Sequence, residues 1–308
     1  MNIFRGKKLT EEIEGTQIVQ VVPCNLEGQK IYLVDTPGFD DSIRTDAEIL
    51  QEIAAWLNAA YKMSVKLTGI IYLHRILDVR VGGAGVRNIR TFKKLCGDDG
   101  LASVVLATTM WSFITDENLG NMRESQLKTE HAFWKKMIEQ GSQVFRQDKG
   151  RTSALRIVQY LIDKKRPVTL DIQREMVDKK LQLVQTGAGI EVATELERAT
   201  KYFEKRMTDL QSQLQDALNK RDSEEKKELE ELIADLKEQN SKRQKDTEKL
   251  MKDTEQLDKE VKERYERELA EMQVQMEMLK ESHSHELKLQ KLQLQQKWKE
   301  EMMRCIVM

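Results

Sequence analysis

Proline and glycine are scarce in this sequence of 308 residues, and they are distributed very unevenly. All three prolines and nearly all of the 15 glycines lie within residues 1–168. Neither residue type occurs from 190 to 304, so that stretch contains no residue that stops a helix. It is also rich in Glu, Lys, Gln, Leu and Met. The contrast predicts a globular domain followed by one or two long helices.

The small number of cysteines and the lack of a long apolar run exclude further classes of protein. Cys24, Cys96 and Cys305 are too few for a disulfide framework and fit no metal-ligand spacing, which favours a reducing cytosolic compartment. No apolar run reaches the ~18 residues of a membrane-spanning helix, and the start of the chain has no signal-peptide core. We therefore expect a cytoplasmic protein that does not cross a membrane.

An excess of charge of one sign is also missing. Lys plus Arg total 51, and Asp plus Glu total 52. Because nucleic-acid binding relies on excess positive charge, this balance gives no electrostatic reason to expect a nucleic-acid partner.

Residues 1–168 alternate between strand-like and helix-like apolar patterns. Strands are expected at 17–22, 30–34, 69–73, 101–107 and 143–146, and helices at 46–61, 86–96, 123–138 and 153–162. Pro23 should end the first strand, and Asp46 and Ser153 should cap their helices. The continuous apolar run at 69–73 is typical of a central parallel strand. The alternation predicts a three-layer α/β domain with right-handed crossovers.

The strand expected at 30–34 ends in a loop that begins Asp35-Thr36-Pro37-Gly38. An aspartate at the carboxyl end of a strand can hold Mg²⁺ or a metal-bound water. Gly38 has no Cβ, which would let its backbone N–H approach a phosphate. The alternative interpretation is an ordinary strand followed by an Asp-Pro-Gly turn. The motifs that follow favour the phosphate site.

Four motifs occur in order in the first half of the chain. They are DTPGFDD at 35–41, IYLHRI at 71–76, TTMW at 108–111 and TSALRIVQYLI at 152–162. On these motifs, residues 1–190 resemble the fungal P-loop GTPase-like proteins, which are related to the immunity-associated nucleotide-binding GTPases and, more distantly, to septins. The resemblance implies a GTP-binding (G) domain that uses Mg²⁺ with GTP.

The resemblance also implies roles for individual residues. Asp35 would support Mg²⁺ through water, and Gly38 would contact the γ-phosphate. Thr16, just before the first expected strand, would complete the metal site, with Thr10 as the weaker candidate. Phe39 stands where some GTPases place a glutamine that orients water. Intrinsic hydrolysis is therefore expected to be slow or to use another residue.

The chain departs from this family at two motifs. No G-x-x-x-x-G-K-S/T loop occurs anywhere, so the first strand and the phosphate cradle are expected to lie before Met1. In the base-reading box N/T-K-x-D, Thr109 keeps the first position, while Met110 replaces lysine and Ser112 replaces aspartate. Thr109 and Ser112 are the candidate nucleotide-binding residues. Loss of the charged acceptor would remove ~1.5–3 kcal/mol of selectivity for guanine.

His74 and Arg75 follow the apolar run at 69–73. A cation at the edge of the sheet could contact a phosphate or stabilise a transition state. The interpretation that we favour is that both residues position the adjacent loop.

The second half of the chain is expected to be a helical linker at 169–189 and a coiled coil at 190–304. Large apolar residues follow the 3,4 spacing of a coiled-coil seam at Leu229, Leu232, Leu236, Leu250, Leu257, Tyr265, Leu269 and Met272. The seam is interrupted by Gln239, Arg243 and Asp246. A single solvated helix is the alternative, and the interrupted coiled coil is favoured. A coiled coil implies self-association.

Residues 305–308, Cys-Ile-Val-Met, have the form C-a-a-X. Methionine in the last position predicts farnesylation of Cys305. One lipid gives only marginal attachment, and pairing of two chains would add a second anchor. This predicts peripheral attachment to the cytosolic face of a membrane. The alternative is a chance match of four residues.

Two functions fit these features. In the first, the G domain at 1–168 belongs to a membrane-tethered GTP-binding switch or assembly factor, with impaired nucleotide binding in this chain. Its GTPase activity is implied by the resemblance alone. In the second, the chain is a nucleotide-free coiled-coil scaffold derived from a GTPase, or a truncated gene model.

Overall fold

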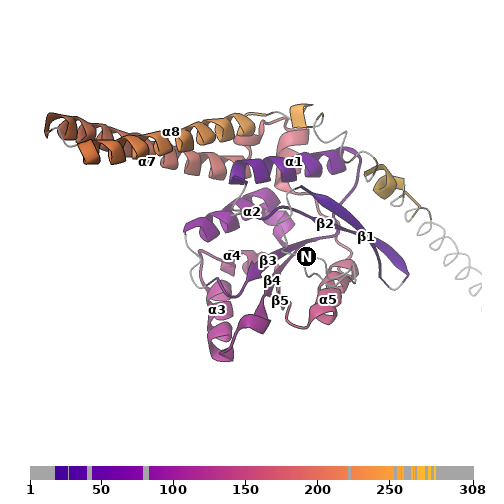
Figure 1. Ribbon diagram of the computed structural model, residues 1–308. Helices are drawn as coiled ribbons and strands as arrows, with labels where there is room; N and C mark the ends of the chain where they lie inside the picture. The colour runs from indigo at the N-terminus through magenta and orange to yellow at the C-terminus, as the bar shows by residue number, and fades with distance from the viewer. Residues whose placement is uncertain are drawn as a thin grey trace, which may run out of the picture.

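The computed structural model of the chain describes residues 18–26, 28–39, 44–78, 83–220 and 223–252, with isolated positions between 255 and 281. The fold is mostly helical, with a three-stranded parallel sheet, a separate antiparallel strand pair and two long helices (Figure 1). Within the described residues, no helix has both the length and the apolar content that crossing a bilayer requires.

The antiparallel pair comes first in the chain. It consists of β1 (Gln20–Leu26) and β2 (Gln29–Asp35), joined by a turn in which Gly28 has a φ of +84° that glycine adopts without strain. Pro23 lies inside β1, opposite Tyr32, so the expectation that it ends the strand is wrong. Proline is tolerated there because it is exposed and β1 pairs, among the described residues, with β2 alone.

The parallel sheet has the order β3 (Ile70–Arg75), β4 (Val104–Thr109) and β5 (Gln143–Arg146). Among the strands that the structure describes, the run at 69–73 therefore lies at an edge, and the expectation of a central strand is wrong. β4 is central, and it is buried from Val104 to Thr108. Helices on both faces of a sheet produce apolar runs in edge and central strands alike, so composition could not distinguish the two.

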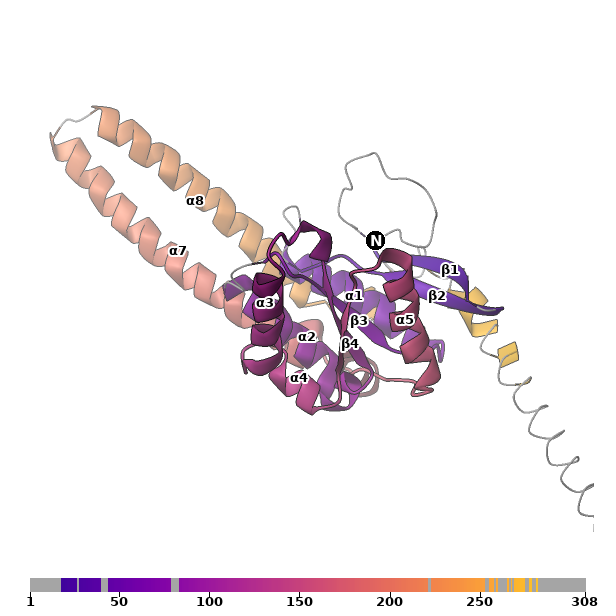
Figure 2. The same cartoon turned by 90° about the horizontal axis from the view of Figure 1, so that it is seen from below.

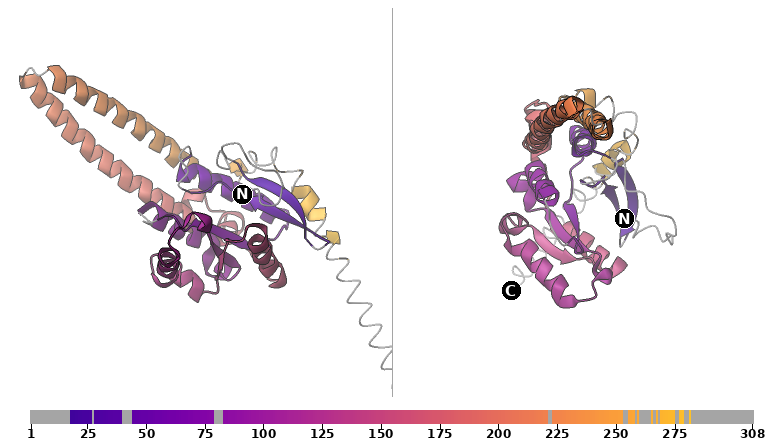
Figure 3. Two further views of the ribbon diagram at one scale, coloured as in Figure 1. Left: turned by 60° about the horizontal axis from the view of Figure 1, so that its bottom comes forward. Right: turned by 60° about the vertical axis from the view of Figure 1, so that its left-hand side comes forward.

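Helices cover both faces of this sheet (Figure 1, Figure 3). On one face, α5 (Gly150–Asp163) packs against Val105 and Ala107 of β4. Leu106 points to the opposite face and joins a larger apolar cluster. Ser153 does not cap α5 but lies in its first turn, where its hydroxyl accepts the Lys149 N–H at 3.0 Å.

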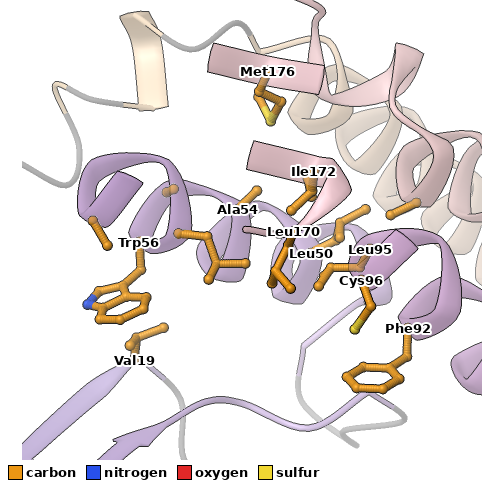
Figure 4. Close-up of a cluster of buried hydrophobic side chains, with 14 of the residues drawn as sticks. Val19, Leu50, Ala54, Trp56, Phe92, Leu95, Cys96, Leu170, Ile172 and Met176 are labelled. Carbon is orange, nitrogen blue, oxygen red and sulfur yellow. The ribbon is translucent and has the colours of Figure 1, made fainter. Parts of the chain in front are cut away.

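The larger cluster is formed mainly by α1 (Asp46–Lys62), by α2 (Gly83–Leu101) and by the segment around residue 172. The helical stripe on each of these helices supplies the buried side chains, as the sequence pattern indicates. Figure 4 shows Val19, Leu50, Ala54, Trp56, Phe92, Leu95, Cys96, Leu170, Ile172 and Met176 converging in this cluster.

The helix expected at 123–138 is two helices, α3 (Glu117–Thr129) and α4 (Lys135–Glu139). The chain turns between them so that Trp134 is fully buried. The Trp134 N–H donates to the Leu127 carbonyl at 2.9 Å, a bond across seven residues that a continuous helix does not make.

The expected linker at 169–189 is a series of short turns instead of one helix. It contains α6 (Asp171–Gln173), a π-helical turn, η2 (Arg174–Asp178), and a 3₁₀ turn, η3 (Leu183–Gln185). A Cβ on Gly189 would collide with the backbone of η3, so the chain needs a glycine where it enters the next helix.

Two long helices, α7 (Gly187–Lys220) and α8 (Ser223–Leu250), pack side by side and project from the domain as a hairpin (Figure 2, Figure 3). Leu210, Leu229 and Ile233 are buried between them. The expectation of long helices in this part of the chain is confirmed for α7 and α8. Their pairing lies within one chain.

Candidate functional site

The loop after β2 is the first part of the candidate site. Asp35 ends β2 opposite Gln20 and is half-buried. Pro37 is buried and Gly38 is exposed. A Cβ built on Gly38 would meet no atom within 4 Å, so the space around this position is open. The loop therefore presents an accessible backbone next to an anchored proline, which suits the approach of a phosphate.

The loop leads to the N-terminus of α1, which is capped by Thr45 and not by Asp46 as expected. Thr45 Oγ1 accepts the Glu48 N–H at 3.3 Å, and Glu48 Oε2 accepts the Thr45 N–H at 3.0 Å. This reciprocal pair satisfies two N–H groups that have no partner within the helix. Asp46 lies in the first turn, where the helix dipole stabilises a negative charge.

The C-terminal end of α8 packs on this start of α1 (Figure 1). Thr45 Oγ1 donates to Asp246 Oδ1 at 2.9 Å, and Lys249 Nζ lies 2.6 Å from Glu48 Oε1. Asp246 and Lys249 are three residues apart on one helix face, as are Thr45 and Glu48. These four residues are called the α1–α8 cluster below.

Burial strengthens the α1–α8 cluster. Asp246 is 4% exposed, so its carboxylate depends on the bond from Thr45 and on Lys249 at 3.5 Å. Partial burial raises the pKa of Glu48, but the bonds from Lys249 and Thr45 outweigh burial and hold that pKa below its usual value. Asp246 is therefore a partner of α1 and not a solvated break in a coiled-coil seam.

The chain beyond α8 also contacts α1. Tyr265 OH donates to Glu52 Oε1 at 2.7 Å. Leu250 and Leu257, two residues of the expected seam, are fully buried in the large cluster of the domain. These seam positions are occupied by contacts within the chain.

The residues of the expected base-reading box lie at the end of β4. Thr109 Oγ1 donates to the His74 carbonyl at 3.3 Å, so its hydroxyl turns back toward β3. Met110 has a φ of +64°, and Ser112 is exposed in the short 3₁₀ helix η1 (Trp111–Phe113). Asp35 and Thr109 end strands of two different sheets.

Beside these residues lies a group formed by Arg146, Glu124 and Trp111, which the sequence analysis did not identify. The Arg146 guanidinium lies 4.1 Å from the Trp111 ring centroid and bonds both oxygens of Glu124, at 2.6 and 3.0 Å. Trp111 Nε1 donates to Thr108 Oγ1 at 2.9 Å. The sequence signal for this group was an arginine at the end of an expected strand, with a carboxylate on the preceding helix.

Both charges of this group are stabilised by their pairing. Burial raises the pKa of Glu124, but the hydrogen bonds from Arg146 and Lys128 outweigh it and hold that pKa below its usual value. The bond to Glu124 raises the pKa of Arg146. Arg146 also donates to Asn121 Oδ1 at 2.9 Å, and Lys128 donates to Glu124 at 2.9 Å, so both charges have partners within the domain.

Arg75 pairs with Asp78, with Nη2 3.2 Å from Oδ1. The His74 ring lies edge-on to Trp134 with centroids 5.8 Å apart, and burial lowers its pKa. Because the partner of Arg75 is three residues further along the chain, the pair orders the turn after β3. This agrees with the interpretation that these residues position a loop.

The remaining candidates concern Mg²⁺ and the lipid. Thr16 and Cys305 lie outside the described residues. Among the described residues, no group of three His, Cys, Asp or Glu side chains could hold a metal ion. Mg²⁺ in nucleotide sites takes one or two carboxylates and completes its shell with phosphates and water, and Asp35 carries a carboxylate.

Two arrangements result from this geometry. The Asp35 to Gly38 loop is open at Gly38 and leads to a helix start on which α8 docks. The charges of Arg146 and Glu124 are paired within the domain. No protein-family model matches the sequence, and no curated protein matches it.

Proposed function

We propose that this protein is a GTP-binding protein of the immunity-associated GTPase type, acting as a switch or assembly factor, with impaired nucleotide binding in this chain. The observation that carries the proposal is the end of β2, where Asp35 is half-buried and the space at Gly38 is open. Thr45, seven residues after Gly38 in the sequence, bonds Asp246 of α8. A ligand that reorders the loop would move the start of α1. The movement would reach the helical hairpin through the α1–α8 cluster.

The loop residues have the chemistry that this role needs. Asp35, half-buried at the end of β2, would hold a water of Mg²⁺. The Gly38 N–H would donate to the γ-phosphate, and the open space at its Cβ position supports this role. Mg²⁺, when bound with GTP, neutralises the charge of the phosphates.

Impaired binding follows from two features of the chain. The sequence contains no G-x-x-x-x-G-K-S/T loop to supply backbone N–H groups and a lysine to the phosphates. At the base-reading box, Ser112 offers a hydroxyl in place of a carboxylate, and the Thr109 hydroxyl is already bonded to His74. We therefore propose weak affinity and poor discrimination against other purine nucleotides.

A second candidate function is a nucleotide-free scaffold. The observation that favours it is that Arg146, Glu124 and the Trp111 N–H, all beside the expected base-reading box, bond other residues of the domain. In that case the hairpin of α7 and α8 would be the functional surface, and the domain would serve as its base.

Attachment and assembly complete the proposal. We propose self-association through the long helices and farnesylation of Cys305, which together would hold the protein at the cytosolic face of a membrane.

Calorimetric titration of the full chain with GTP and Mg²⁺ tests the proposal. We expect a dissociation constant weaker than about 100 µM, which corresponds to less than about 5.5 kcal/mol of binding free energy. Asp35→Ala should remove the dependence of binding on Mg²⁺, whereas Asp78→Ala, another loop aspartate, should leave it unchanged. Competition with ATP measures base selectivity.

The outcomes separate the two candidates. Micromolar affinity contradicts impaired binding. No heat of binding at millimolar GTP favours the scaffold. Equal Mg²⁺-dependent binding by the Asp35→Ala variant and the wild type contradicts the proposed role of Asp35 at the metal.

A further inference from the structure

Two helices lie side by side over β3 on one face of the domain. Phe92 of α2 packs on Tyr72 of β3 with ring centroids 4.7 Å apart, and Trp134, just before α4, packs on His74 of the same strand with centroids 5.8 Å apart. Tyr72 and His74 are two residues apart in β3, so they point to the same face of the sheet. α2 and α4 therefore form one surface of the domain (Figure 1, Figure 2).

Three lysines lie on this surface, next to the aromatic residues that hold it to the sheet. Lys93 and Lys94 follow Phe92 directly, and Lys136 comes two residues after Trp134. Lys94 and Lys136 are exposed, and Lys93 is half-buried. Among the residues that the structure describes, none of the three pairs with a carboxylate. These three residues are called the lysine patch below.

Two ion pairs join α2 to α7 beside the lysine patch. Arg90 pairs with Glu191 at 3.2 Å, and Arg87 pairs with Glu195 at 3.1 Å. Each pair uses a carboxylate that α7 presents to α2. The two arginines therefore take up this negative charge, and the charges of the lysines remain uncompensated.

Lys93 experiences the combined effect of these charges. Burial lowers its pKa, and the charges of Lys136, Arg90 and Lys94 lower it further, while Glu191 acts in the opposite direction. The influence of Lys136 also shows that α4 brings its charge close to α2. Cations that repel one another gain from a partner that carries several negative charges.

A surface of anionic lipids is the partner that these observations favour. Nucleic acid is the other common polyanion, but Lys plus Arg total 51 against 52 for Asp plus Glu, which leaves no excess positive charge. A single farnesyl chain attaches a protein only marginally, and a basic patch is one of the second signals that make attachment stable. About two dozen residues separate Glu281 from Cys305 and can span up to about 80 Å, so one membrane is within reach of both.

We propose that the lysine patch binds the anionic headgroups of phospholipids and is a second membrane signal beside the lipid on Cys305. The inference rests on the membrane attachment proposed above and names its contact surface. It is independent of nucleotide binding.

Vesicle sedimentation of the full-length Cys305→Ser variant isolates the lysine patch, because this chain cannot be farnesylated. Vesicles of phosphatidylcholine alone are compared with vesicles that also contain phosphatidylserine, at about 0.1 M salt. We expect binding only to the vesicles with phosphatidylserine, and weaker binding as the salt concentration rises. The farnesylated wild type should bind both kinds of vesicle and should prefer those with phosphatidylserine.

Substitutions in the Cys305→Ser chain locate the contact. Lys93→Gln, Lys94→Gln and Lys136→Gln should each lower the partition coefficient about fivefold, and the triple variant should lose binding. Lys205→Gln and Lys237→Gln, at exposed lysines of α7 and α8, are the matched controls and should leave binding unchanged. Circular dichroism should show the same melting temperature, or a higher one, for the triple variant, because its substitutions remove repulsion and no ion pair.

Each outcome supports or contradicts the proposal. Equal binding to both kinds of vesicle, no binding to either, or equal loss of binding in the patch and control variants contradicts it. Tighter binding to a DNA duplex than to the vesicles would assign the lysine patch to nucleic acid and would also contradict it. Mass spectrometry of Cys305 and calorimetry with GTP are separate measurements, so failure of the lipid or nucleotide proposals is distinguished from failure of this one.

Discussion

Removing the Thr45 hydroxyl should lower the free energy of unfolding by more than the loss of one small polar group usually does. Thr45→Ala removes the bond accepted from the Glu48 N–H and the bond donated to Asp246. Loss of the N-cap costs about 1 kcal/mol. Asp246 is 4% exposed, so loss of its neutral donor adds about 1.5–3 kcal/mol. We expect the free energy of unfolding to fall by about 2.5–4 kcal/mol.

Equilibrium unfolding in urea, followed by tryptophan fluorescence, measures this change, because Trp56 lies on α1 and is 2% exposed. A double-mutant cycle with Asp246→Ala isolates the bond between the two residues, and we expect a coupling energy of about 1–2 kcal/mol. Thr45→Ser keeps the hydroxyl and should lose little stability. Asp235→Ala, at an exposed aspartate of the same helix, should change stability by less than about 0.5 kcal/mol.

Additive effects of Thr45→Ala and Asp246→Ala would refute this reasoning, because they would mean that the two side chains do not interact in solution. If Thr45→Ala lowers the free energy of unfolding by only about 1 kcal/mol, Thr45 acts as a helix cap alone and does not help to dock α8.

Three further predictions concern other parts of the molecule. The pKa of Glu124 is lowered, so its pairing with Arg146 stabilises the fold fully above pH 4.5, the ordinary pKa of a glutamate, and this contribution is lost as the pH falls below that value. In acid unfolding experiments, the stability of Glu124→Gln should therefore approach that of the wild type. A constant difference in stability down to about pH 3 would argue against the pairing. Gly189→Ala should lower the melting temperature because its Cβ would strike a neighbouring backbone carbonyl, whereas Gly38→Ala, with open space at that position, should leave it unchanged. Mass spectrometry of protein from its native cells should show a farnesyl group on Cys305 and loss of the last three residues; an intact carboxyl terminus would contradict the lipid prediction.

Local patterns in the sequence predicted several elements correctly. The apolar run before Asp35 forms β2, the short strand at 143–146 forms β5, and the helical periodicity after residue 46 forms α1. These elements are specified by side chains close together in sequence, with strand or helix periodicity that records which face is buried. The two strands expected at the start of the chain pair antiparallel in the structure, around the turn at Gly28.

The failures have a different physical origin. Asp246 interrupts the apolar seam of α8, and its partner Thr45 is 201 residues away, so no local pattern could show that it bonds the cap of α1. The chain is not helical between Thr129 and Lys135, because burial of Trp134 next to His74 of β3 outweighs helical continuity. Glu124 and Arg146 are separated by 22 residues and meet only in the folded chain. In each case tertiary packing overrides local propensity.

The central claim is that the loop from Asp35 to Gly38 and the end of α8 respond together to nucleotide. Hydrogen–deuterium exchange with and without millimolar Mg²⁺ and GTP tests it most directly. We predict slower exchange in peptides that span residues 36–48, a simultaneous change in the last turn of α8, and neither change in the Asp35→Ala variant. Unaltered exchange in both regions, or a change in the loop without one in α8, would contradict the coupling.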